Sequence, residues 1–201
     1  MKKKSIWLLV CFFTVFCSPN FEEADLLEKE FNIINNKKDL NTRVLYYNQP
    51  LLINNGTAKI STVNDSNSIE SIDLSSIEEL NHTWYFVAEV NPPTINGANL
   101  SATYVQVIDD LAFVTYNKQG NQYAGGLEIY DLSNKAYPSI ISQVLFEDAD
   151  VNAIGVDFQG NRNFRQIWLA LSHKKHGAMV RKMDIEDGLI SENVADIKLS
   201  D

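Results

Sequence analysis

The segment Val107-Ile-Asp-Asp-Leu-Ala-Phe-Val-Thr-Tyr116 decides the fold class of this 201-residue chain. Its two runs of β-branched, aromatic and aliphatic residues are separated by the turn-forming pair Asp109-Asp110, which predicts two antiparallel strands in a hairpin. Two further runs of the same kind follow, at Leu127–Leu132 and Ser139–Phe146. The sequence therefore predicts four short antiparallel strands within about 45 residues, with no helix between them.

A second group of strands repeats this order further along the chain. Phe113 aligns with Trp168 and Tyr130 with Met183, at offsets of 55 and 53 residues. A four-stranded antiparallel unit that recurs at a period of about 50 residues is typical of β-propeller blades, and a β-sandwich with similar hairpins is the alternative. The strands expected in this group are Ala153–Asp157, Gln166–Leu171, Ala178–Ile185 and one that begins at Leu189.

Three pieces of the first group carry a resemblance to a known family: Val107–Tyr116, Gly125-Gly-Leu-Glu-Ile-Tyr-Asp-Leu-Ser-Asn134 and Pro138–Gln143. They resemble one unit of the LVIVD-repeat β-propellers, with its Ala-Tyr-Val strand, Gly-Gly-Leu-x-Ile-x-Asp strand, Ser-Asn/Asp-Pro turn and closing strand. The match is good over residues 84–145 and weak over 151–201, where the paired glycines are missing. The resemblance implies blades like those of exported lipoproteins of Bacteroidetes-like bacteria, and it carries no agreed catalytic residues.

Three features of the matching unit have structural explanations. We expect Gly125-Gly126 to supply positive φ angles where the loop re-enters the sheet. Asp131 is expected to cap the turn through Ser133, and Pro138 to fix the start of the next strand. The aromatic residues of both groups are expected in the cores of the blades rather than on a sugar-binding platform; they are Trp84, Tyr104, Phe113, Tyr116, Tyr130 and Trp168.

The chain divides into a leader (1–17), a polar spacer with a short helix and few strands (18–82), and the repeats (83–201, as about 83–148 and 149–201). The helix is expected within 21–36, where apolar residues fall near helical spacing, and a mobile tether is the alternative for this segment. The fold class predicted is thus all-β, with about two propeller-type blades. Closing a propeller takes at least four blades, so we expect a truncated reading frame, with blades from other subunits or an open pair of sheets as the alternatives.

The N-terminus has the composition of a signal peptide. Three lysines precede the apolar run Ile6–Phe16, which is too short to span a membrane. Cys17 then resembles the acceptor of a bacterial lipoprotein signal, although Phe16 stands where a small residue is usual. We therefore expect an exported, lipid-anchored protein of the cell envelope, in the periplasm or at the outer membrane. Ordinary cleavage near Cys17, which would release a secreted protein, is the alternative.

Composition excludes several partners and sites. Of 17 basic residues three lie in the leader, so its removal leaves 14 against 26 acidic residues. Such a deficit of positive charge disfavours nucleic acid and anionic lipid as partners, so membrane contact is expected only through the lipid anchor.

Both cysteines, Cys11 and Cys17, lie in the first 17 residues. This position excludes disulfides and a cysteine-based zinc site from the folded part.

No motif for catalysis, a metal or a cofactor is found in the sequence. His82, His173 and His176 are the only histidines, and the last two are expected in a solvated loop because two lysines lie between them. The acidic pairs Asp109-Asp110 and Glu147-Asp-Ala-Asp150 lack the spacing of a calcium loop and are expected to be surface carboxylates. We assign no catalytic or metal-binding residue and leave the ligand-binding residues unknown.

The function expected from these observations is a binding or scaffold module for a protein or glycan partner, with no catalytic role. A propeller-based hydrolase or lyase whose site lies partly outside this chain is one alternative, since propeller sites draw residues from many blades. A nonfunctional fragment of a longer gene is another. If the chain is complete, its blades are expected to be completed in a homo-oligomer.

Overall fold

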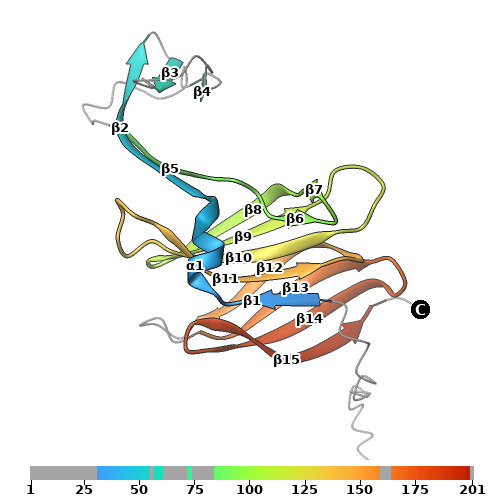
Figure 1. Cartoon of the computed structure of the whole chain (residues 1–201). Coiled ribbons are helices and arrows are strands. Elements are labelled where there is room, and N and C mark those ends of the chain that lie inside the picture. Colours follow the sequence, from blue (N-terminus) through green and yellow to red (C-terminus); the bar gives the residue numbers. More distant parts are fainter. Residues whose placement is uncertain (1–30, 55–56, 61–71, 74–83, 159–163, 200–201) are drawn as a thin grey trace, which may run out of the picture.

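The structure is a computed structural model that describes residues 31–54, 57–60, 72–73, 84–158 and 164–199 (Figure 1). These residues are mostly antiparallel β-sheet, as the sequence predicts, with one short helix, α1 (Lys37–Leu40), followed by the 3-10 turn η1 (Asn41–Arg43). The leader, with Cys17, lies outside the described residues, and so does His82.

Sheet 1 contains the first group of predicted strands. Its strands are β8 (Ser101–Ile108), β9 (Leu111–Asn117), β10 (Gly125–Asp131) and β11 (Ser139–Phe146), which pair in chain order. A fifth strand, β1 (Phe31–Ile34), joins the outer edge of β11 in antiparallel register, with Phe31 opposite Phe146. The predicted β8–β9 hairpin is confirmed, and Asp109 at its turn has φ of 51°.

Sheet 2 contains the second group. Its strands are β12 (Ala149–Phe158), β13 (Phe164–His173), β14 (Gly177–Glu186) and β15 (Leu189–Lys198), again paired in chain order. The predicted turn between β14 and β15 is present, with positive φ at Asp187 and Gly188, as tight hairpins between right-twisted strands require. The four-stranded repeat predicted from the sequence is therefore present as two four-stranded meanders.

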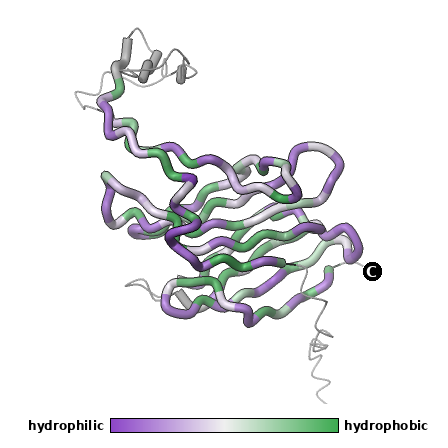
Figure 2. The backbone as a smooth tube through the Cα atoms, in the orientation of Figure 1, coloured by the Kyte–Doolittle hydropathy of each residue, from purple (hydrophilic) through white to green (hydrophobic). Residues whose placement is uncertain are grey.

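The two sheets stack face to face and do not close. Strand β12 lies against β9 and β10, while β15 lies against β11 and β1, so both sheets run in the same strand order. The apolar core fills the space between them, and Figure 2 shows the hydrophobic residues along these strands. Its buried members are Leu111, Phe113, Leu127, Ile129, Val144, Phe146, Ala149, Val151, Ile167, Leu169, Leu171, Met179, Met183, Ile185 and Ile190.

A separate arm projects from sheet 1 (Figure 1). It contains β2 (Val44–Asn54), β3 (Thr57–Ile60), β4 (Ile72–Asp73) and β5 (Tyr85–Val90), in the order β4-β3-β2-β5. The predicted strand Trp84–Val90 is therefore present as β5, but it pairs with β2 rather than with a strand of sheet 1. A two-stranded hairpin, β6 (Thr94–Ile95) and β7 (Ala98–Asn99), follows it.

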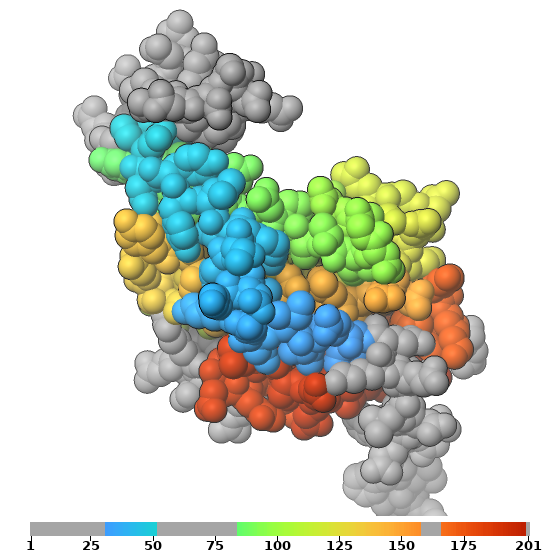
Figure 3. Space-filling model, viewed as in Figure 1, coloured from blue at the N-terminus to red at the C-terminus, as the bar shows by residue number. Residues whose placement is uncertain are grey.

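Residues 31–44, which we call the strap, run across sheet 1 (Figure 3). The helix expected within 21–36 is not found in the described part of that range, where Phe31–Ile34 is strand β1. Strand pairing with β11 overrides the helical spacing, because it supplies backbone partners and buries Phe31 and Ile33 against the core. The short helix α1 begins after Asn36, whose side chain accepts hydrogen bonds from Lys38 N and Asp39 N.

The paired glycines of β10 are needed for a reason other than the expected one. Neither Gly125 nor Gly126 has a positive φ. A Cβ on Gly125 would lie 2.8 Å from the carbonyl oxygen of Ala149, and one on Gly126 would lie 2.8 Å from that of Val144. The glycines therefore permit close packing of neighbouring strands. The expected cap is confirmed, since Ser133 N donates to Asp131 Oδ1 at 2.9 Å.

Candidate functional site

A pocket of about 320 Å³ lies at one end of the two sheets. Four connections meet there: the β6–β7 hairpin, the β9–β10 loop, the β11–β12 turn and the β13–β14 turn. Its volume is at the lower end of the range for small-molecule sites, roughly 300–1,000 Å³. It is lined by Ile95, Asn96, Lys118, Asn121, Gln122, Tyr123, Ala124, Glu147, Asp148 and Lys174.

The wall formed by the β6–β7 hairpin is fixed by a small apolar cluster. Ile95 and Leu100 are buried against Tyr116 and Ala124. The hairpin turns through Asn96 and Gly97, which both have positive φ, as a two-residue hairpin loop requires. Asn96 is thereby held in the wall of the pocket.

Backbone hydrogen bonds fix the other walls. Lys118 N donates to Ala124 O at 2.7 Å and closes the β9–β10 loop, and Lys174 N donates to Asp148 O at 2.8 Å and joins the two remaining turns. Ala124 N donates to Asp150 Oδ1 at 3.2 Å, which links the β9–β10 loop to β12. Burial raises the pKa of Asp150, and the bond from Ala124 opposes that shift.

The crossing of the chain from sheet 1 to sheet 2 is fixed beside the pocket by Asn117. Its Nδ2 donates to Val151 O at 3.2 Å, and its Oδ1 accepts from Val151 N at 2.6 Å. One side chain thus satisfies both backbone groups of the residue where β12 passes under β9. The pocket is therefore built beside a hydrogen-bonded junction between the two sheets rather than on loops alone.

The chemistry of the pocket suits a polar ligand held by many weak contacts. The charged lining residues are Lys118, Lys174, Glu147 and Asp148. Lys174 and Asp148 form a long ion pair, with 3.8 Å between Nζ and Oδ1. The amides of Asn96, Asn121 and Gln122 supply both donors and acceptors. Tyr123 is 41 % exposed and presents an apolar ring with a polar tip.

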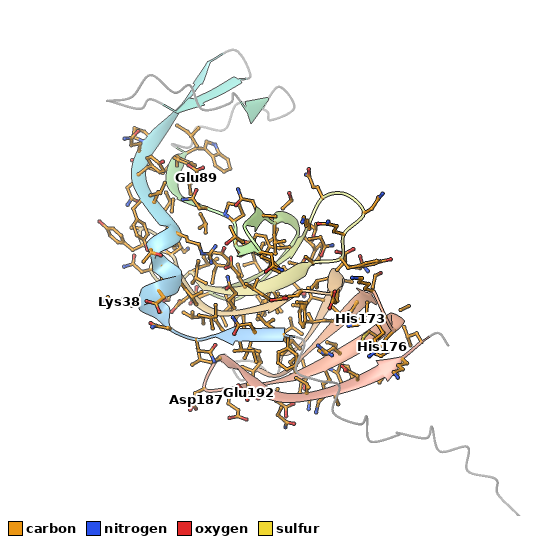
Figure 4. All side chains as sticks on the ribbon, turned by 45° about the vertical axis from the view of Figure 1, so that its right-hand side comes forward. Lys38, Glu89, His173, His176, Asp187 and Glu192 are labelled. Atoms are coloured by element: carbon orange, nitrogen blue, oxygen red, sulfur yellow. The ribbon has the colours of Figure 1, made fainter. Side chains whose placement is uncertain are left out.

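The histidines of the β13–β14 turn do not form a solvated loop. His173 is buried, and its Nδ1 accepts from Lys175 N at 3.0 Å and from His176 N at 3.2 Å, so the imidazole caps the turn. The two rings lie 4.7 Å apart between centroids, and Figure 4 shows both at the end of sheet 2 opposite Asp187. In the described part of the chain, no group of three or more His, Cys, Asp or Glu side chains could hold a metal ion.

The two predicted acidic clusters lie at opposite ends of the molecule. Glu147 and Asp148 line the pocket, whereas Asp109 and Asp110 form the β8–β9 turn at the other end of sheet 1.

The prediction that six aromatic side chains lie in the core is correct for three of them. Phe113, Tyr116 and Tyr130 are buried. The other three, Trp84, Tyr104 and Trp168, are exposed.

A buried polar cluster on the far side of sheet 1 is not evident from the sequence. Glu128 is 0 % exposed in the middle of β10. Its Oε1 accepts hydrogen bonds from the Arg43 guanidinium and from Gln143 Nε2, and its Oε2 accepts from the Tyr130 hydroxyl at 2.6 Å. The Tyr116 and Tyr130 hydroxyls lie 2.8 Å apart. The only sequence signal is a carboxylate within the apolar run Gly125–Asp131.

This cluster holds the strap in place rather than performing chemistry. Burial, and then the nearby Glu128 carboxylate, raise the pKa values of Tyr116 and Tyr130 well above the usual range. Both phenols therefore stay protonated and act as hydrogen-bond donors or acceptors. Arg43 also donates to Asn91 O at 2.7 Å, so one side chain joins the strap, β10 and the segment after β5.

Comparisons with known proteins give no family for this chain: no family model matches it, and no curated protein or solved structure gives a significant match. No enzyme family or enzyme homologue is therefore identified. Among the described residues, no helix is both long enough and apolar enough to cross a membrane.

Proposed function

We propose that this chain is a lipid-anchored cell-envelope protein whose stacked sheets are β-propeller-type blades of the LVIVD-repeat kind and serve as a binding module. The pocket at the loop end of the sheets is its ligand site. The ligand is a neutral saccharide presented by a glycan partner. The observation that carries the proposal is the convergence of the β6–β7 hairpin and three connections of the stacked sheets on one pocket lined mainly by polar and charged residues.

The stacking of the sheets supports the blade interpretation. Successive propeller blades pack face to face with the same strand order, and the outer strand of one leads directly to the inner strand of the next. Here β11 leads to β12 through Glu147 and Asp148. Phe113 and Trp168 occupy the same position in the repeat. Phe113 lies on the face of sheet 1 toward sheet 2, and Trp168 lies on the face of sheet 2 away from sheet 1. These faces are equivalent, because each is the face that a following blade would cover.

The lining residues favour a saccharide over a charged ligand. Two lysines and two carboxylates nearly balance in charge, so neither a phosphate nor a cation gains a net attraction. Amides that offer donors and acceptors suit hydroxyl groups, and the exposed ring of Tyr123 offers an apolar face for a sugar ring.

A printed array of neutral oligosaccharides, followed by saturation-transfer NMR with any saccharide that binds, tests the site. We expect binding by the unmodified protein, loss of binding in Tyr123→Ala, and retention in the control Tyr85→Ala, which removes another exposed tyrosine, on the arm away from the pocket. Binding to no saccharide, or equal loss in both variants, contradicts the proposal.

The anchor is tested separately at Cys17. Expression in a bacterial host with labelled palmitate should label the protein and place it in the membrane fraction. Cys17→Ser should abolish both, because a thioether to diacylglycerol needs the cysteine sulfur. A Cys17→Ser variant that stays in the membrane fraction contradicts the anchor without affecting the proposed saccharide site.

A further inference from the structure

The outward face of sheet 2, the face away from sheet 1, carries an apolar row that crosses all four strands, with rows that include polar residues on either side. Strand pairing aligns Ala153, Ala170, Val180 and Ile197 in one row across all four strands. The adjacent row contains Gly155, Trp168, Lys182 and Ala195. Trp168 is 36 % exposed and Ile197 is 37 % exposed.

This face differs from an ordinary solvated sheet face. Antiparallel strands with one face in water alternate apolar residues inward with polar residues outward. Here the outward row from Ala153 to Ile197 has no polar member. A contiguous apolar patch of this kind marks an interaction surface.

The equivalent stacking surfaces of the molecule are already occupied. The face of sheet 1 toward sheet 2 forms the core, and the opposite face of sheet 1 is covered by the strap and by residues 88–100. Beneath that cover, Ala112, Tyr130 and Ile140 are buried against Leu40 and Val44. Among the described sheet faces of the two stacked sheets, the outward face of sheet 2 is thus the one left without a cover.

The covered face of sheet 1 determines how a second copy could dock. A head-to-tail stack would set sheet 2 of one copy on the outward face of sheet 1 of the next, but the strap occupies that face. In the part of the two stacked sheets that the structure describes, the apolar face that a second copy can offer is therefore that of its own sheet 2. Contact between two identical faces has two-fold symmetry and closes after two copies.

Size and charge fit such a contact. Four strands of ten residues each span about 19 by 33 Å, a footprint of about 600 Å² before side-chain relief. A standard interface buries about 800 Å² on each partner. The face carries both signs of charge, with Lys182 Nζ 3.2 Å from Asp184 Oδ1, so two identical faces need not repel each other.

We infer that this protein forms a two-fold dimer in which the outward faces of the two copies of sheet 2 pack against each other. The dimer surface is distinct from the saccharide pocket, and the inference does not rest on the proposed function. In the dimer, the row from Ala153 to Ile197 is buried, and Trp168 of each copy leaves water.

Sedimentation equilibrium of the full chain at about 1 to 100 μM tests the inference. This range covers the weakest dissociation constants, about micromolar, expected for an interface of this size. We expect the mass of a dimer. Val180→Lys sets a charge in the centre of the contact on both copies and should weaken association about 100-fold or more. The matched control is Val107→Lys on β8, where the valine is 58 % exposed on a different sheet and dimerisation should persist.

A second variant and a second signal keep the test decisive if Val180→Lys does not fold. Ala195→Lys places the charge on the exposed outer strand of the same face and should also weaken association. Tryptophan emission should shift to shorter wavelength as the concentration rises, and Trp168→Phe should remove that shift. A monomer throughout the concentration range, a dimer unaffected by both lysines on sheet 2, or equal weakening by Val107→Lys overturns the inference.

Discussion

Sheet 1 and sheet 2 share one strand order but differ in what covers their outward faces. The strap and residues 88–100 lie on sheet 1, where they bury the carboxylate of Glu128 against Arg43. Sheet 2 has no such cover among the described residues, and its outward face exposes an apolar row beside the Lys182–Asp184 ion pair. Two copies of one supersecondary unit therefore have different environments, because a covering segment crosses only one of them. Sheet 1 is an interior layer, and the outward face of sheet 2 is a surface.

The largest difference between the two outward faces is expected from the same substitution made on each. Ala112→Lys should destabilise the protein by about 4 kcal/mol or more, because it buries an unpaired ammonium under the strap. Ala195→Lys should change the free energy of unfolding by less than about 0.5 kcal/mol, since it lies on an exposed surface. Urea unfolding at a concentration low enough to keep the protein monomeric measures both.

Equal destabilisation by the two substitutions would contradict the difference between the faces. A small effect of Ala112→Lys alone would mean that the strap does not stay on sheet 1 in solution. Amide hydrogen exchange at Leu40 and Val44 would then show loss of protection in the unmodified protein as well.

The next largest effect is expected at the ion pair that fastens the strap. Arg43→Ala should destabilise the protein by about 3 kcal/mol, because it leaves the fully buried Glu128 carboxylate without its charged partner. Lys182→Ala, at the partly exposed pair on sheet 2, should cost less than about 1 kcal/mol. Chemical unfolding of both variants measures this difference.

A double variant is the control for the cause of the Arg43 effect. Glu128→Gln removes the buried charge, so Arg43→Ala should cost much less in that background. If the two substitutions are additive, the loss arises from packing of the arginine stem and not from the unpaired carboxylate.

The smallest effect is expected at the junction between the sheets, where the pKa of Asp150 is raised. The folded state then binds the proton of this carboxyl more tightly than the unfolded state does. Its contribution to stability is present below the unfolded pKa, about 4, and is lost as the pH rises through the raised pKa. At neutral pH, Asp150→Asn should therefore slightly stabilise the protein while keeping the acceptor for Ala124 N.

Thermal unfolding of Asp150→Asn and the unmodified protein between pH 3 and pH 7 measures this effect. The gain of the variant should be present at pH 7 and vanish below about pH 4. A gain that is independent of pH would show that the ionisation of Asp150 is not its cause.

Local signals in the sequence predicted the eight strands of the two meanders. Alternating apolar residues predicted β8 and β9, and the Asp109-Asp110 pair predicted the turn between them. Asp131 was correctly predicted to cap the following turn, through its hydrogen bond from Ser133 N. The repeat of about 50 residues predicted two meanders in the same order. The acidic residues Glu147 and Asp148 were visible as a surface pair, but their place in a pocket was not.

Only the tertiary structure decided which faces are buried and where the pocket forms. Glu128 is joined to Arg43 across 85 residues and Asn41 to Ile140 across 99, and no local pattern encodes such pairings. Residues 31–34 form strand β1 rather than the expected helix because the edge of sheet 1 supplies backbone partners and buries Phe31 and Ile33. Local propensity therefore set the strands of the two meanders, whereas pairing and burial over long chain separations set strand β1, the cover on sheet 1, the exposed face of sheet 2 and the pocket.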